Sequence, residues 1–281
     1  MIKFETIDVE IPKILYHYTD LNSFMGIIEK KELWASNIMY SNDQAELQYP
    51  IRLLLNRLKQ RSNEEKLNNI DLITLSTIIE INQTPRICVF SLSTKKDNLS
   101  QWRGYSKSVP GICLGIDTSL FNMQKFYNLE RAQLVKCKYD DEEHINIIDN
   151  IINESISAIE RDGRLGNENI MYQIYERLYS YCPTIKTDGF QDENEWRYII
   201  EVKDINASSY CFRQRNTTLL PYFILKIEDL KKVIKEIIIG PNPKEKITED
   251  AVIDFCLKNG LRNSQQFGTN ISTSKLTYMN W

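Results

Sequence analysis

Apolar residues recur along the chain with two spacings, which predict short strands and amphipathic helices. Residues 14–16 are apolar and predict a short strand ending near His17, with Thr19 or Asp20 capping the element that follows. Apolar side chains then stand at positions 21, 24, 27 and 28, a spacing typical of a helix. Helical spacing also recurs in residues 51–58, 67–80, 145–159 and 170–181 and after Thr248. Apolar or alternating runs predict further strands at residues 33–37, 86–93, 111–117, 132–139, 195–202, 222–227, 236–239 and 270–278.

The order of these elements predicts the fold class. Strands come in clusters and not in strict alternation with helices, which favours an α+β fold with a mostly antiparallel sheet. Residues 141–183 are helical in pattern and interrupt the strands. We interpret them as a helical insertion into a single domain, residues 1–281, whose core covers about 14–140 and 186–280.

The composition is that of an ordinary globular protein. Of the 281 residues, 42% are hydrophobic and 26% are charged, and the formal net charge is −3. That charge argues against a protein that holds nucleic acid mainly by bulk positive charge, but it is compatible with a local basic groove. There is no apolar run of membrane-spanning length, no apolar secretory-signal core in residues 1–5, and no C-x-x-C pair among the six cysteines. We therefore expect a reduced, cytoplasmic protein with no membrane partner and no structural metal.

Three polar clusters lie on the apolar strands, where a rigid backbone holds side chains in place. The first is His17-Tyr18-Thr19, before a helix N-terminus, where oriented N–H groups often hold phosphates. The alternative is a partly buried histidine bonded to a backbone carbonyl. The second cluster is Ser91 and Ser93, which share one face of a strand. They line a cavity if that face points inward and are ordinary solvated residues if it points outward.

The third polar cluster lies at the start of a late strand. Glu193, Glu195 and Arg197 fall on one side of this strand, with Trp196 and Tyr198 on the other. One interpretation is a solvated face that contributes little to stability. The other is that Glu193 and Arg197 hold Glu195 ionised and aimed into a cleft, with Glu195 at the cleft mouth. An arginine lowers the pKa of a neighbouring carboxyl and a second carboxylate raises it, so the net direction stays open.

Residues 101–105 carry an aromatic pair, Trp102 and Tyr105, beside Gly104. Such a pair stacks on a flat heterocycle in some sites, but it more often belongs to the core or to a lid. The chain lacks a phosphate-binding glycine motif and an H-E-x-x-H sequence. His144 stands at a charged helix start, where we expect it to be solvated, so neither Ser-His-Asp nor Cys-His chemistry finds support.

These segments together resemble the bacterial family catalogued as domain of unknown function 2971. The resemblance covers about residues 14–280, nearly the whole chain. The matching pieces are LYHYT (15–19) with its helix, LWASN (33–37), FSLS (90–93) through QWRGY (101–105), GICLG (111–115), ENEWR (193–197) and IIIGP (237–241).

A second resemblance suggests chemistry. A histidine on the first strand, a serine-bearing strand and a glutamate near the start of a late strand resemble the three-part signature of ADP-ribosyltransferases. Here these parts are His17, then Ser91 and Ser93, then Glu195, although the serine motif reads Ser-Leu-Ser without the usual threonine. The resemblance implies a split, mostly antiparallel sheet with flanking helices and with the substrate NAD in its cleft. It also implies that the two serines support the glutamate and the cleft wall.

The same resemblance implies further roles. His17 would bond the adenosine ribose and the nicotinamide amide, and either Tyr105 or Trp102 would stack on nicotinamide. Glu195 would bond the 2′-hydroxyl of the nicotinamide ribose and stabilise the positive charge of the transition state. Glu193 would orient the acceptor or take its proton. The candidate site then has Glu195 and Glu193 as catalytic residues, no metal, and as NAD-binding residues His17, Tyr18, Thr19, Ser91, Ser93, Trp102, Tyr105 and Arg197.

Three functions are compatible with these patterns. The leading hypothesis is an ADP-ribosyltransferase-like enzyme that cleaves the nicotinamide–ribose bond of NAD and transfers ADP-ribose to protein, nucleic acid or water. The alternative is a non-catalytic module that binds a nucleotide or a partner in phage defence or signalling. A metal-dependent phosphodiester enzyme using Glu193 and Glu195 is disfavoured, because no third acidic ligand or histidine stands near them in sequence.

Overall fold

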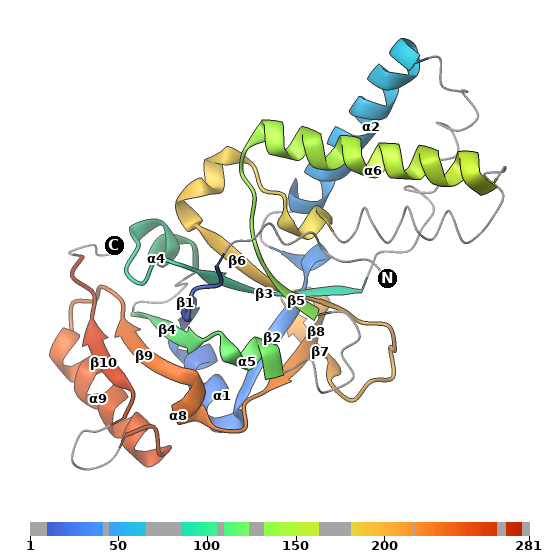
Figure 1. Ribbon diagram of the computed structural model, residues 1–281. Helices are drawn as coiled ribbons and strands as arrows, with labels where there is room; N and C mark the ends of the chain where they lie inside the picture. The colour runs from blue at the N-terminus through green and yellow to red at the C-terminus, as the bar shows by residue number, and fades with distance from the viewer. Residues whose placement is uncertain are drawn as a thin grey trace.

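The computed structural model describes residues 10–41, 45–65, 86–105, 110–123, 132–162, 181–215, 217–262 and 268–276 (Figure 1). The strands in these ranges are β1 (Ile14–Asp20), β2 (Glu32–Asn37), β3 (Ile87–Ser93), β4 (Gly111–Asp117), β5 (Ala132–Lys136), β6 (Glu195–Glu201), β7 (Tyr210–Arg215), β8 (Thr218–Lys226), β9 (Ile234–Ile239) and β10 (Asn270–Thr273). The α-helices are α1 (Leu21–Lys30), α2 (Ala45–Glu65), α4 (Leu99–Tyr105), α5 (Ser119–Met123), α6 (Asp141–Asp162), α8 (Leu230–Val233) and α9 (Glu245–Lys258). The 3-10 helices are η1 (Ile38–Tyr40), η3 (Cys182–Thr184) and η4 (Asp188–Glu193).

The described strands form one sheet in the order β10-β9-β4-β1-β3-β2-β8-β7, with β6 paired to β3 and β5 paired to β6. Every pair is antiparallel except β10 with β9. The predicted α+β class with a mostly antiparallel sheet is therefore confirmed.

Strand β3 joins two parts of the sheet that diverge from each other. One edge of β3 pairs along its whole length with β6, from Ile87 to Ser93. The other edge is shared, because β2 joins β3 at residues 88–89 and β1 joins it at Ser93. The sheet thus forks along this edge, and Ser91 lies on β3 between the two junctions.

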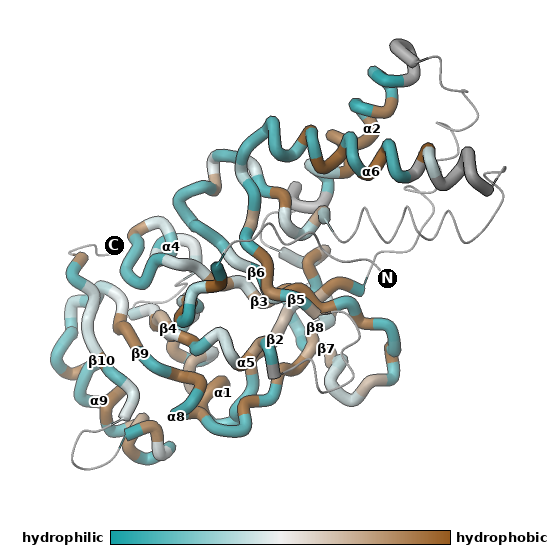
Figure 2. Tube along the Cα trace, in the orientation of Figure 1, coloured by the Kyte–Doolittle hydropathy of each residue, from teal (hydrophilic) through white to brown (hydrophobic). Residues whose placement is uncertain are grey.

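Apolar side chains pack on both faces of the sheet. Successive residues of a strand point to opposite faces, so Phe90 and Tyr198 join the larger core while Ile87 and Ile199 join a second cluster. The larger core also receives side chains of α1 and α9, and the second cluster receives those of α2 and α6. Figure 2 shows hydrophobic residues recurring along α6, as expected for a helix with one buried face.

The start of the chain differs from the prediction at His17. Strand β1 continues to Asp20, because Tyr18 and Thr19 pair with β4, and His17 therefore lies in the middle of the strand. Asp20 is the N-cap of α1, and its Oδ1 accepts a hydrogen bond of 2.7 Å from the backbone N–H of Ser23. The prediction that His17 ends a strand beside a helix N-terminus was wrong, and a carboxylate already occupies that N-terminus.

Other differences concern the edge of the sheet and the helical segments. The edge strand β7 was not predicted, and β8 begins at Thr218 where the sequence indicated residue 222. The helix predicted over residues 67–80, and nearly all of the one predicted over 170–181, lie outside the described residues.

Three further features bear on the function classes. All six cysteines lie in the described ranges and are free thiols, five of them buried. Across the same ranges, no helix combines the length and the apolar character that a membrane crossing requires. No group of three or more histidine, cysteine, aspartate and glutamate side chains there is arranged to hold a metal ion.

Candidate functional site

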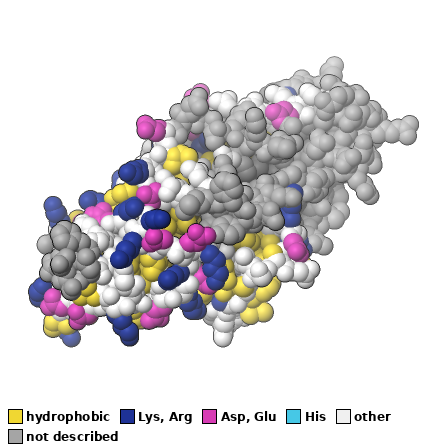
Figure 3. All heavy atoms as spheres, turned by 60° about the horizontal axis from the view of Figure 1, so that its bottom comes forward, with side chains coloured by type: hydrophobic (Ala, Val, Ile, Leu, Met, Phe, Trp, Pro, Cys, Tyr) yellow, Lys and Arg dark blue, Asp and Glu magenta, His cyan; other side chains and the backbone are white. Residues whose placement is uncertain are grey.

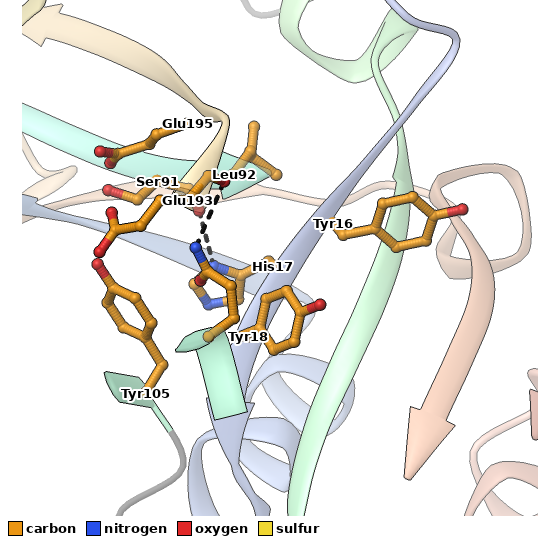
Figure 4. Close-up of a pocket in the computed structure, with 9 residues that line it drawn as sticks. Tyr16, His17, Tyr18, Ser91, Leu92, Tyr105, Glu193 and Glu195 are labelled. Atoms are coloured by element: carbon orange, nitrogen blue, oxygen red, sulfur yellow. Dashed lines mark hydrogen bonds between the residues drawn. The ribbon is translucent and has the colours of Figure 1, made fainter. Parts of the chain in front are cut away.

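A pocket lies where β1, β3, α4 and the junction of η4 with β6 meet (Figure 4). Its lining residues are Tyr16, His17, Tyr18, Ser91, Leu92, Gln101, Tyr105, Glu193 and Glu195. The pocket thus brings together His17, Ser91 and both glutamates, which are far apart in sequence. The volume open to water molecules is about 40 Å³. That volume holds a few water molecules at most and is far below the roughly 300–1,000 Å³ of typical ligand pockets.

One wall of the pocket is backed by a buried cluster of charged side chains. Arg197 donates two hydrogen bonds to the Glu195 carboxylate, from Nε to Oε1 at 2.8 Å and from Nη2 to Oε2 at 2.9 Å. Lys186 Nζ lies 2.8 Å from Glu195 Oε2 and 2.5 Å from Glu193 Oε2. Glu195, Arg197 and Lys186 are each about 3% exposed. The solvated-face interpretation is therefore wrong, and so is the expectation that Glu195 stands at the mouth of a cleft.

The two glutamates have pKa values shifted in opposite directions. Burial alone would raise the pKa of Glu195, but the charges and hydrogen bonds of Arg197 and Lys186 outweigh it and lower this pKa to about 2. Burial raises the pKa of Glu193, and the opposing effect of Lys186 does not cancel it. Glu195 is consequently a fixed anion at neutral pH, whereas Glu193 is the carboxylate that exchanges a proton more readily.

The backbone around Glu193 is held by three contacts. Ser93 Oγ donates a hydrogen bond of 2.7 Å to the Glu193 carbonyl, and Gln101 Nε2 donates one of 3.4 Å to the same oxygen. Asn194, between the two glutamates, is in the left-handed region with φ 42°, and its carbonyl accepts a bond from Thr94 N–H. Asparagine often takes this conformation where a helix ends, and Asn194 ends η4, with its N–H bonded to the Gln191 carbonyl.

His17 forms an uncharged part of the opposite wall. Its Nδ1 lies 3.0 Å from the Ser91 carbonyl oxygen, and its ring stacks on Phe90 with centroids 4.3 Å apart. A carbonyl only accepts, so Nδ1 carries the proton. Burial lowers the pKa of His17, although the bond to Ser91 opposes this. The ring is therefore neutral at pH 7 and has Nε2 as an acceptor. The partly buried histidine bonded to a backbone carbonyl, predicted as the alternative, is what the structure contains.

The two aromatic residues of α4 differ in whether they line the pocket. Tyr105 lines the pocket, and in Figure 4 its hydroxyl points toward the Glu193 carboxylate. Burial, together with the charges of Glu195 and Glu193, raises the Tyr105 pKa, so the phenol stays protonated. Trp102 packs edge-on against Tyr18, with centroids 4.7 Å apart, and its Nε1 donates to Asp97. Trp102 is buried beside the pocket and does not line it.

Of the remaining predicted residues, Tyr18 lines the pocket, and Thr19 and Arg197 do not. Thr19 is buried on β1 and does not line the pocket. Arg197 lies behind Glu195, and its Nη1 donates a hydrogen bond of 2.8 Å to the Pro183 carbonyl. Tyr18 lines the pocket, and its hydroxyl donates to the Lys95 carbonyl at 2.7 Å.

Two residues of this site were missed from the sequence, and one histidine was misplaced. Lys186 and Gln101 have no periodic or motif signal that links them to the glutamates. His144 was expected in solvent but is fully buried, with Nε2 2.9 Å from the Lys138 carbonyl and Nδ1 3.2 Å from the Tyr49 hydroxyl. The charged residues at the start of this helix suggested that His144 is solvated. They are its neighbours in sequence, whereas the His144 side chain itself is buried.

A family model described as protein of unknown function (DUF2971) matches residues 101–198 of the chain. The matched span includes Tyr105, Glu193 and Glu195 and leaves out His17 and Ser91. No curated protein and no solved structure matches this chain. The resemblance to DUF2971 is thus supported over residues 101–198, a narrower span than the sequence pieces indicated.

Proposed function

We propose that this pocket is the reaction site of an ADP-ribosyltransferase-like enzyme that cleaves the nicotinamide–ribose bond of NAD. The observation that carries the proposal is the meeting of His17, Ser91, Glu193 and Glu195 in one pocket, with the two carboxyl pKa values pushed apart. Pairs of titratable groups with diverging pKa values are typical of acid–base sites. The forked, mostly antiparallel sheet also supports the proposal, because the ADP-ribosyltransferase resemblance implies a split antiparallel sheet.

Glu195 is suited to stabilise developing positive charge. As nicotinamide leaves with the bonding electron pair, the ribose becomes oxocarbenium-like, and a fixed carboxylate nearby stabilises that state more than the substrate. Arg197 and Lys186 occupy three of the roughly four lone-pair positions of Glu195. The position that remains, on Oε1, is the one we assign to the 2′-hydroxyl of the nicotinamide ribose.

Glu193 is suited to accept the proton of the acceptor. The new bond forms between the acceptor oxygen or nitrogen and the ribose carbon, and the acceptor proton passes to Glu193. The Glu193 side chain is 15% exposed, more than that of Glu195 at 4%, so it is the more accessible carboxylate. His17 Nε2 would accept a hydrogen bond from the substrate, and Tyr105, the α4 aromatic that lines the pocket, would stack on nicotinamide.

A second candidate function is a non-catalytic module that binds a nucleotide or a partner. The small pocket volume, about 40 Å³, favours the partner-binding form of this module, because a dinucleotide would enter only after the walls separate. The described part of the face in Figure 3 carries basic and acidic side chains interspersed, with no patch of one sign that points to a particular acceptor. Protein, nucleic acid and water are therefore separate arms of the test.

Nicotinamide release and label transfer test the proposal. The full chain is incubated with NAD labelled in nicotinamide or in the adenosine half, with and without cell extract treated with nuclease or protease. We expect release by the wild type and a loss of about 10²–10⁴-fold in Glu193→Gln. The matched control is Asp192→Asn, because Asp192 is adjacent and its side chain is 83% exposed.

One result would contradict the enzyme, and another would contradict the role given to Glu193. NAD binding by calorimetry without nicotinamide release from the wild type favours the binding module. Release that is equal in wild type and Glu193→Gln removes Glu193 from the chemistry. Glu195→Gln is compared per folded molecule, since Glu195 is also part of a buried ion network.

A further inference from the structure

Lys186 occupies an unusual place for a lysine. It follows η3, and its backbone N–H donates a hydrogen bond of 2.9 Å to the Lys138 carbonyl. From there its side chain reaches the two glutamates and is 2% exposed, with Nζ 4.7 Å from the centre of the Phe190 ring. Lysine is almost never fully buried unless it is paired, since removing an ammonium from water is costly. Its position between the carboxylates offsets that cost.

Among the described residues, Lys186 is the cation that pairs with Glu193. Its Nζ lies 2.5 Å from Glu193 Oε2, whereas Arg197 donates hydrogen bonds to Glu195 and to the Pro183 carbonyl. One ammonium thus bridges two carboxylates with different tasks. Glu195 would keep Arg197 as a partner if Lys186 were neutral, but Glu193 would lose its ion pair with Lys186.

The segment that carries Lys186 is anchored away from the pocket. Cys182 and Ile185 are buried in the cluster that includes side chains of α2 and α6, and Ile185 pairs with Lys138 in an isolated bridge. The Pro183 carbonyl in the same segment accepts from Arg197. The backbone around Lys186 therefore has several fixed points, and the ammonium does not depend on a flexible surface chain to find the carboxylates.

We infer that Lys186 is a positioning residue that sets the protonation state of Glu193 and thereby its capacity to accept a proton. The inference deepens and rests on the proposed function of this site. Lys186 does not line the pocket, so it acts through Glu193 and not by contact with substrate. Its effect is expected on kcat, with the KM for NAD nearly unchanged.

Other groups also act on Glu193. Glu195 and Arg197 come from β6, Tyr105 from α4 and His17 from β1. Tyr105 and His17 are neutral at pH 7, and the Arg197 charge, although it pairs with Glu195, also lowers the Glu193 pKa. Burial has the largest effect and raises this pKa. Among the charged groups Lys186 has the largest effect, and it opposes both burial and the repulsion of Glu195.

The experiment measures the Glu193 carboxyl directly. Glutamate side chains of the full chain are labelled with ¹³C, the Glu193 resonance is assigned by its loss in Glu193→Gln, and its titration is followed by NMR. In Lys186→Met we expect this titration to move upward by about 1 to 3 pH units. The acid limb of the kcat profile for nicotinamide release moves with it, and Lys186→Arg restores both.

A matched control and a second variant keep the test decisive. Lys138→Met removes a neighbouring lysine whose partner is Glu143, and it should leave the Glu193 titration unmoved. If Lys186→Met does not fold, Lys186→Gln keeps an N–H donor without the charge and takes its place. A Glu193 titration that stays within about 0.3 pH units in the neutral variant overturns the inference. If the wild type releases no nicotinamide but the titration moves, the proposed function fails and the assignment of Lys186 to Glu193 stands.

Discussion

The two walls of the pocket are built by different means. On the β6 side, Lys186, Glu195 and Arg197 are buried and paired, so charge attraction and hydrogen bonds fix the geometry. On the β1 side, His17 is neutral, rests on Phe90 and is anchored by one hydrogen bond to the Ser91 carbonyl. The first wall holds charge at fixed points and the second offers an uncharged acceptor. The proposed function would use both walls, the first for the developing cation and the second for neutral groups of the substrate.

Arg197→Met, in the charged wall, should cause the largest loss of stability among these variants. The substitution leaves Glu195 buried with Lys186 alone and removes the donor to the Pro183 carbonyl. We expect a loss of about 3 to 5 kcal/mol in the free energy of unfolding, measured by urea titration, because a buried charge pair is broken from one side. Lys226→Met, at the exposed pair with Glu32, is the control and should cost at most about 1 kcal/mol. Equal costs would mean that the charged wall is not held by its ion pairs.

Ser93→Ala should have the next largest effect. Ser93 Oγ donates to the Glu193 carbonyl and accepts from Lys95 N–H at 3.0 Å, so alanine leaves both groups short of a partner. The expected cost is about 1 to 3 kcal/mol in the free energy of unfolding. Ser91→Ala is the control, because the described bond of Ser91 uses its backbone carbonyl. It should stay within about 0.5 kcal/mol of the wild type. The reverse order would show that the pocket serine, not Ser93, supports the charged wall.

Phe90→Leu tests the uncharged wall. Loss of the ring removes the stacking partner of His17. The free energy of unfolding should fall by about 1 kcal/mol in addition to the loss expected from the smaller buried apolar area. The His17 pKa should rise toward its ordinary value of 6.5, because a less enclosed imidazole is better hydrated. Proton NMR of the ring measures it. Phe24→Leu, at a core ring pair with Phe255, should leave that pKa in place. A His17 pKa that responds equally to both changes would argue against a specific Phe90 support.

The smallest predicted difference between the two walls is in how their contributions to stability depend on pH. The His17 pKa is lowered in the folded protein, so its contribution is complete above pH 6.5 and is lost as the pH falls below that value. The Glu195 pKa is lowered to about 2, so its contribution is lost between pH 4.5 and about 2. Glu193, with a raised pKa, acts in the opposite direction, stabilising the folded state as the pH falls through its folded value.

Comparison with a variant isolates the histidine. Urea titrations at pH 7.5 and 5.5 should show a smaller pH effect in His17→Gln than in the wild type, whereas the loss below pH 4.5 should be common to both. A wild-type difference that His17→Gln leaves unchanged would assign the effect to another group.

Most strands could be predicted from the sequence, because a buried strand face requires apolar residues at its positions. The run 111–117 gives β4 with the same bounds, and residues 86–93 and 195–202 differ from β3 and β6 by one residue. Strand β7 was missed because Tyr210–Arg215 is an edge strand whose polar alternate positions resemble a loop. The preference of a sequence for the strand conformation largely reflects how its side chains are buried and packed, and an edge strand is less buried than a central one.

The site was less predictable than the fold. Sequence spacing placed Glu195 and Arg197 on one face of β6, and the two-residue period sufficed for that. It could not find Lys186, because its contact with Glu195 depends on the path of an irregular segment after η3. Nor could it place His144, whose burial follows from the packing of α2 on α6. Tertiary contacts of this kind produce no periodic pattern of residues in the sequence.

The fork along β3 has a mechanical consequence. Strand β1 is tied to β4 at seven positions but to β3 at one, Tyr16 with Ser93. Few main-chain bonds, each worth about 0.5 to 1.5 kcal/mol net, therefore join the two parts of the sheet across the fork. The long β3–β6 ladder fixes the register on the other edge, with Ser91 opposite Arg197 and Ser93 opposite Glu195. The distance between His17 and the charged wall thus depends on side-chain packing, because Leu15 of β1 and Phe90 of β3 share the larger core.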